Sequence, residues 1–75
     1  MDIIVYSKPN CVQCEATKKL LDTKGITYQV IDLHRDEMAL QKVVALGYRE
    51  VPVVVTSSSH WSGFRPGMIN QLCLN

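Results

Sequence analysis

Cys11-Val12-Gln13-Cys14 follows a short apolar segment, Asp2–Tyr6, and opens an amphipathic one, Val12–Lys24. The first segment predicts a β-strand covered on both faces, and the second predicts an α-helix that Gly25 ends. Two cysteines spaced i, i+3 across the first turn of a helix can form a disulfide with little movement of the backbone. The order strand, CxxC, helix is therefore typical of thiol–disulfide chemistry.

The place of Cys11 at the expected start of the helix predicts which sulfur attacks. The unpaired N–H groups and the partial positive charge of a helix N-terminus favour a thiolate and lower the pKa of a thiol. We expect Cys11 to be exposed and nucleophilic, and Cys14 to be shielded one turn into the helix. Cys11 would attack a substrate disulfide, and Cys14 would then release the reduced substrate. Lys8 either stabilises this thiolate through space or is a solvated loop lysine.

The rest of the chain predicts an α/β fold with the element order β-α-β-α-β-β-α. In the first helix, Val12, Ala16 and Leu20 recur at i, i+4 and i+8 and Leu21 widens the stripe, so we expect this stripe to face the core. A parallel βαβ unit and a later antiparallel hairpin predict a four-stranded mixed sheet flanked by helices on both faces. No linker or repeat divides the chain, so we expect residues 1–75 to form one domain. The later elements are predicted as a strand at Thr27–Asp32, a helix after Asp36 that ends at Gly47, strands at Val51–Thr56 and His60-Trp61, and a helix from Pro66.

Composition narrows the class of protein. Hydrophobic residues make up 47% of the 75 residues, which favours a folded globule over a disordered chain, and a net charge of +1 gives no reason to expect nucleic acid or acidic lipid as partners. No apolar run is long enough for a bilayer, and residues 1–10 lack the pattern of a signal peptide. We therefore expect a cytoplasmic monomer in a compartment that keeps thiols reduced. Three cysteines fit a reactive pair plus a spare thiol, Cys73, better than a disulfide framework.

Two further segments are candidates for the site. Pro52, at the start of the third strand, either lies at a sheet edge or holds a cis peptide bond. In this topology the start of that strand lies against the cysteine loop, where the backbone of Val51 could pair with an extended substrate chain. The segment Trp61-Ser62-Gly63-Phe64-Arg65-Pro66 carries two large aromatic residues, which either pack in the core or mark a binding surface. Arg65 either contacts a partner or fixes the loop.

A metal-binding module is the alternative of a different class. His34 and His60 could be added to the cysteines as zinc ligands. Only Cys11 and Cys14 have the spacing of a ligand pair, however, and a tetrahedral zinc site needs four ligands. We predict no metal.

Taken together, these segments resemble the NrdH-type redoxins, which are glutaredoxin-like proteins of the thioredoxin fold. The resemblance covers nearly the whole chain. It rests on Cys11-Val12-Gln13-Cys14, on Val51-Pro52-Val53-Val54, and most specifically on Trp61-Ser62-Gly63-Phe64-Arg65-Pro66 followed by Met68-Ile69. It implies a thioredoxin-like fold with a cis Pro52, with Cys11 as the nucleophile and Cys14 as the resolving thiol.

The resemblance also implies a pathway. NrdH-type redoxins deliver electrons to class Ib ribonucleotide reductase, whose large subunit would be the partner, and receive them from NADPH through thioredoxin reductase. No bound cofactor is implied, because the electrons travel as thiols. Trp61 and Phe64 are implied to lie on the surface that meets the reductase. The residues expected to bind substrate or partner are Lys8, Val12, Gln13, Val51, Pro52, Trp61, Phe64 and Arg65.

The nearest alternative is a glutathione-dependent glutaredoxin. Glutaredoxins carry a Gly-Gly pair, followed closely by Asp or Asn, that binds the γ-glutamyl end of glutathione. The corresponding stretch here is Gly63-Phe64-Arg65-Pro66, which lacks that pattern and in which Pro66 has no N–H to donate. We therefore expect glutathione to be a poor reductant. Separately, Gly67 departs from the NrdH-type pattern, which often has Asp after the proline.

Overall fold

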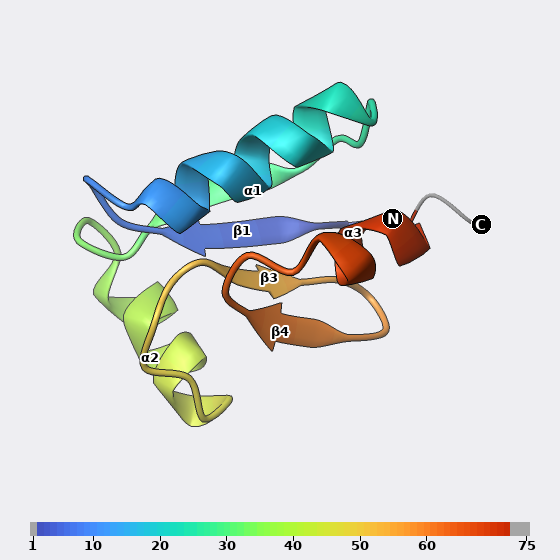
Figure 1. Ribbon diagram of the computed structural model, residues 1–75. Coiled ribbons are helices and arrows are strands. Elements are labelled where there is room, and N and C mark those ends of the chain that lie inside the picture. Colours follow the sequence, from blue (N-terminus) through green and yellow to red (C-terminus); the bar gives the residue numbers. More distant parts are fainter. Residues whose placement is uncertain (1, 73–75) are drawn as a thin grey trace.

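The computed structural model describes residues 2–72, and their elements follow the predicted order β-α-β-α-β-β-α (Figure 1). The fold is thioredoxin-like. Cys73 lies outside the described residues. None of the helices in the described range is long and apolar enough to cross a bilayer. The elements are β1 (Ile4–Ser7), α1 (Val12–Thr23), β2 (Gln29–Asp32), α2 (Glu37–Ala45), β3 (Val53–Val55), β4 (His60–Ser62) and α3 (Pro66–Leu72).

The four strands form one mixed sheet in the order β2-β1-β3-β4. β1 pairs in parallel with β2 and antiparallel with β3, so that Val5 lies opposite Val30 on one side and Val54 on the other. β4 pairs antiparallel with β3. Because β1 and β3 run in opposite directions, the C-terminal end of β1 and the N-terminal end of β3 lie at the same end of the sheet. The loop that leads to Cys11 and the segment that contains Pro52 therefore meet there.

Helices cover both faces of the sheet. On the face covered by α1 and α3, Leu21 and Ile69 pack against strand residues that include Val5, Val54 and Trp61. On the opposite face, Ala39 and Val43 of α2 pack against Tyr6 and Val53. Figure 1 shows α1 and α2 on opposite sides of β1 and β3. The expectation of helices on both faces is confirmed.

The buried face of α1 confirms the prediction only in part. Cys14 and Leu21 are fully buried as expected, but so is Thr17, while Val12 is 84% exposed and Leu20 is only partly buried. Val12 and Cys14 are two residues apart, so they lie on nearly opposite sides of the helix, and the side with Cys14, Thr17 and Leu21 packs on the sheet.

The strand boundaries also shift by one or two residues. β3 begins at Val53 because Pro52 has no N–H to give to the ladder. β1 extends to Ser7, and β2 begins at Gln29. These shifts leave the predicted topology unchanged.

Candidate functional site

Cys11 occupies the N-cap position of α1. Its backbone is extended, with φ −109° and ψ 106°, and Asn10 before it turns the chain with a positive φ of 60°. The N–H of Cys14 donates a hydrogen bond to Cys11 Sγ at 3.2 Å, as N-cap side chains accept from the first turn. The carbonyl oxygen of Cys11 accepts from Glu15 N at 3.1 Å and begins the helix. A thiolate at this position is stabilised by the N–H and by the positive end of the helix dipole.

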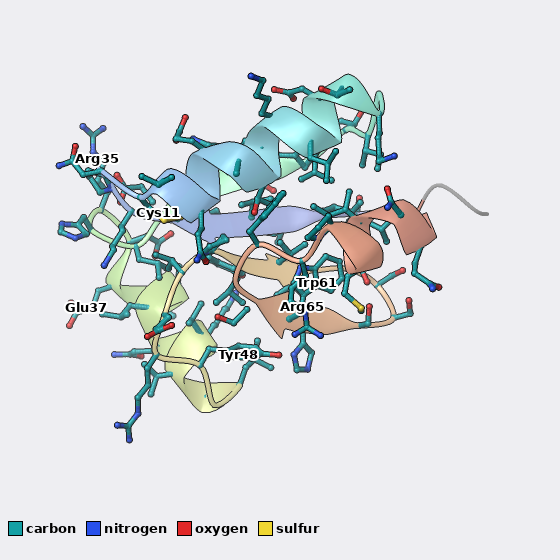
Figure 2. The ribbon with its side chains drawn as sticks, viewed as in Figure 1. Cys11, Arg35, Glu37, Tyr48, Trp61 and Arg65 are labelled. Carbon is teal, nitrogen blue, oxygen red and sulfur yellow. A yellow bond between two sulfur atoms is a disulfide. The ribbon has the colours of Figure 1, made fainter. Side chains whose placement is uncertain are left out.

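The two cysteines are joined by a disulfide but differ in exposure. Their Cα atoms are 5.2 Å apart, within the range that disulfides span. Cys14 is fully buried, while Cys11 is partly exposed at the end of the sheet, where Figure 2 labels it. Only the sulfur of Cys11 can meet another molecule without movement of the backbone. This asymmetry agrees with the predicted division between an attacking and a shielded sulfur.

The segment before β3 lies against Cys11. The peptide bond between Val51 and Pro52 is cis, as the resemblance implies. The carbonyl oxygen of Val51 lies 3.9 Å from Cys11 Sγ, although 40 residues separate the two in sequence. Pro52 is fully buried, and its carbonyl oxygen accepts a hydrogen bond from Gly63 N at 2.8 Å.

A groove of about 320 Å³ opens beside the disulfide. It brings together four residues predicted as binding residues and adds two charged ones, Arg49 and Glu50, that the sequence analysis missed. Their position directly before Val51-Pro52 was the signal that could have found them. The lining residues are Lys8, Cys11, Val12, Gln13, Arg49, Glu50 and Val51.

Residues 62–64 are hydrogen-bonded to both other parts of the site. Ser62 Oγ donates to the carbonyl oxygen of Glu50 at 2.9 Å. Phe64 N donates to the side-chain oxygen of Gln13 at 3.4 Å, a long hydrogen bond that joins residues 51 positions apart. With the Gly63 contact, these bonds hold the loop after β4 against both the Pro52 segment and the cysteine turn. The Phe64 side chain remains 38% exposed, and Arg65 is exposed beside it.

Trp61 requires a correction. Its side chain is only 3% exposed and packs in the core with Val54 and Ile69. Figure 2 shows Trp61 close to α3, on the inner side of the molecule. The side chain has almost no surface left for a partner, so the expectation that Trp61 meets the reductase is withdrawn. Of the two aromatic residues in this segment, only Phe64 offers a surface contact.

No third metal ligand joins the cysteines within residues 2–72, because no group of three His, Cys, Asp or Glu side chains comes together there. His60 is instead engaged by the hydroxyl of Tyr48, which lies 2.7 Å from its Nδ1. The metal-binding alternative therefore lacks a ligand set in this part of the chain.

Comparison with known proteins agrees with this geometry. The sequence matches the family model described as Glutaredoxin over residues 3–61. The chain belongs to the glutaredoxin family. The matched region of this glutaredoxin contains both cysteines, Pro52 and Trp61, and it ends before Phe64 and Arg65.

Within the glutaredoxin family, the chain is of the NrdH type. It is 42% identical to the glutaredoxin-like protein NrdH of Escherichia coli (strain K12), over 96% of this chain and 89% of that protein. It is 36% identical to the protein of the same name from Lactococcus lactis subsp. cremoris, over 93% of this chain and 97% of that protein. The NrdH-type glutaredoxin described here is thus a redox protein whose Cys11 and Cys14 form a disulfide.

Two solved structures are similar to this glutaredoxin. NrdH-redoxin from Escherichia coli, solved to explain its thioredoxin-like activity profile, superposes with a TM-score of 0.93 at 42% identity and covers 96% of this chain and 95% of its own. Buckwheat glutaredoxin in complex with glutathione superposes with a TM-score of 0.74 at 30% identity, over 96% of this chain and 76% of its own. The fold is therefore shared by a protein with thioredoxin-like activity and by one that binds glutathione.

Proposed function

We propose that this glutaredoxin is a dithiol–disulfide oxidoreductase that donates electrons to class Ib ribonucleotide reductase. Thioredoxin reductase, using NADPH, reduces it again. We propose that it acts in the cytoplasm, as a single-domain monomer without a bound cofactor. The observation that carries this proposal is the unequal pair of sulfurs: Cys11 at the helix N-cap, partly exposed, and Cys14 fully buried behind it.

The proposed reaction moves two electrons through these sulfurs. The Cys11 thiolate attacks one sulfur of a disulfide in the large subunit of the reductase and forms a mixed disulfide. The other sulfur of the partner leaves as a thiolate and takes up a proton. Cys14, as a thiolate, then attacks Cys11 Sγ, which frees the second partner thiol and closes the Cys11–Cys14 disulfide. Thioredoxin reductase restores the dithiol by the reverse exchange.

The surface around Cys11 is the proposed docking surface. Val12 and Phe64 give it exposed apolar contact area, Lys8 gives it positive charge, and the exposed Arg65 follows Phe64 in sequence. The backbone of Val51 lies where an extended partner segment could pair with it, next to the attacking sulfur. Gln13 is exposed on this surface, whereas Pro52 is fully buried and offers a partner no contact of its own.

Two observations support a protein reductant over glutathione. The loop after β4 offers few free N–H groups to a carboxylate: Gly63 N is bonded to Pro52, Phe64 N is bonded to Gln13, and Pro66 has none. The Escherichia coli relative at 42% identity has been described as thioredoxin-like in its activity.

Two coupled assays test the proposal. In the first, NADPH oxidation is followed with thioredoxin reductase, this protein and class Ib ribonucleotide reductase with its ribonucleotide substrate. In the second, glutathione and glutathione reductase replace thioredoxin reductase. We expect turnover in the first assay and little in the second, and no turnover in either with Cys11→Ser. Turnover only with glutathione would overturn the proposed electron source.

A glutathione-dependent glutaredoxin is the second candidate. It is favoured by the 30% identity and the shared fold with buckwheat glutaredoxin, which was solved with glutathione bound. The same pair of assays decides between the two, because each candidate predicts turnover where the other predicts little.

A further inference from the structure

We propose that Gln13 is a specificity-determining residue that keeps carboxylate-bearing small thiols away from the disulfide. Its side-chain oxygen accepts the hydrogen bond that the N–H of Phe64 could otherwise donate to a carboxylate of a thiol such as glutathione. This inference rests on the proposed function, in which a protein and not glutathione reduces the disulfide. It adds one residue to the reason for that preference.

Gln13 contacts the loop after β4 directly. It lies between the two cysteines, in the first turn of α1, and its Oε1 accepts from Phe64 N at 3.4 Å. Gly63, with a φ of +88°, brings the loop so close that a Cβ there would lie 3.7 Å from the same oxygen. Across 51 residues of sequence, this side chain is thus the direct hydrogen-bonded link between the cysteine turn and the loop after β4.

The Phe64 N–H is bonded to a side chain and not to the main chain. The neighbouring Gly63 N–H donates to the carbonyl oxygen of Pro52, and Pro66 has no N–H. Shortening the Gln13 side chain would free the Phe64 N–H, which could then donate to a carboxylate.

A carboxylate would have to compete with Gln13 for the Phe64 N–H. A carboxylate oxygen that approached Phe64 N would meet the Gln13 oxygen, also an acceptor, and two acceptors repel each other at one N–H. Because the Gln13 contact is intramolecular, a carboxylate from solution must displace a group that is already in place. A protein that docks over Val12 and Phe64 through apolar contacts has no need of this N–H. The residue thus acts against small anionic thiols and leaves protein partners unaffected.

The test compares two small thiols without any reductase. The oxidised protein is reduced either with glutathione or with β-mercaptoethanol, which has no carboxylate, and the rates are read by quenching, alkylation and mass spectrometry. In both reactions two thiols supply two electrons and leave as one disulfide, while Cys11 and Cys14 become thiols. The readout is the ratio of the two rate constants. A general change in the reactivity of the disulfide moves both rates and cancels in this ratio.

We expect Gln13→Ala to raise the ratio roughly two- to tenfold, the factor that corresponds to one net hydrogen bond. Gln13→Glu should lower it below the wild-type value, because a carboxylate at this position repels the carboxylates of glutathione. Gln41→Ala, the same change at an exposed position of α2, should leave the ratio as it is.

An unchanged ratio in Gln13→Ala, or a raised one in Gln13→Glu, would overturn the inference. Failure of the proposed function has a different signature. It would appear as a wild-type protein that thioredoxin reductase does not reduce, a measurement in which the thiol ratio plays no part.

Discussion

Cys11 and Cys14 are the same residue type three positions apart, yet their surroundings differ sharply. Cys11 Sγ accepts the N–H of Cys14 at 3.2 Å and remains partly exposed. Cys14 lies on the side of α1 that faces the core and is fully buried. Sequence spacing predicted this difference, because the helix start alone decides which cysteine is the N-cap. It could not predict the contact between Gln13 and Phe64, which no local pattern encodes.

Alkylation of the reduced protein should reveal the difference between the two thiols. We expect iodoacetamide to modify Cys11 first, and the pH midpoint of its rate to lie below that of a free-cysteine peptide measured in parallel. The reason is that the N–H of Cys14 and the helix N-terminus stabilise the thiolate and lower the pKa of the Cys11 thiol. Peptide mapping assigns the modified residue. Modification of Cys14 before Cys11, or a midpoint equal to that of the peptide, would contradict this expectation.

At the scale of elements, α1 shows where pattern reasoning succeeds and where it fails. Its start, its end near Gly25 and the role of its first turn were predictable, since they follow from caps and from the cysteine spacing. Its buried face was predictable only in part: Cys14 and Leu21 are buried as expected, but an apolar Val12 points to solvent and a polar Thr17 points inward. Burial there is decided by how the helix lies on β1 and β3, which are distant parts of the chain. The hydroxyl of Thr17 is buried, and it finds no hydrogen-bond partner within the described residues.

Thr17→Val should therefore stabilise the protein. The substitution keeps the shape of the side chain and removes a hydroxyl that lost its water on folding without gaining a partner. We expect the free energy of unfolding to rise by about 1 kcal/mol and Tm by about 4–8 °C. Thermal unfolding of the oxidised protein, followed by circular dichroism, measures this change.

The matched control is Thr23→Val on the same helix. Thr23 is exposed, and its Oγ1 donates to the carbonyl oxygen of Lys19 at 2.9 Å. That variant loses a satisfied hydrogen bond and should gain no stability. Equal effects of the two substitutions would show that the buried hydroxyl of Thr17 carries no cost.

At the scale of the whole molecule, one tyrosine ties α1 to the segment that leads into β2. Tyr28 Oη donates to Asp22 Oδ1 at 2.8 Å, and the carbonyl oxygen of Lys18 lies 3.3 Å away. Partial burial, followed by the hydrogen bond and the charge of Asp22 and by the charge of Glu15, raises the pKa of Tyr28 from 10.0 to about 12. The folded protein thus holds this proton more tightly than the unfolded chain does.

The raised pKa predicts a loss of stability in alkali. Between pH 10.0 and about 12 the unfolded chain releases the phenolic proton while the folded protein retains it, so rising pH favours unfolding. The stabilisation is complete below pH 10.0 and disappears as the pH passes about 12. Urea midpoints of the wild type and of Tyr28→Phe should converge across this window, since the variant lacks the group. A difference that stays constant with pH would refute the assignment.

The small size of the molecule makes its binding surface a large share of the whole. Its accessible surface is 5063 Å², and a standard interface covers about 800 Å² on each partner. A partner centred on Cys11 would thus cover roughly a sixth of the protein. The topology that brings the cysteine loop and the Pro52 segment to one end of the sheet was predictable from the order of the elements. The hydrogen bond that joins Phe64 to Gln13 was visible only in the structure.

The bond from Gly63 to Pro52, together with the Gln13 and Val51 contacts, has a consequence for protein synthesis. The cysteines leave the ribosome long before Val51, Pro52 and Phe64 do. A nascent chain therefore carries both thiols before the segments that lie beside Cys11 in the folded protein have been made. On the proposed function, selective exchange at Cys11 is expected only after residues 51–64 have folded against it.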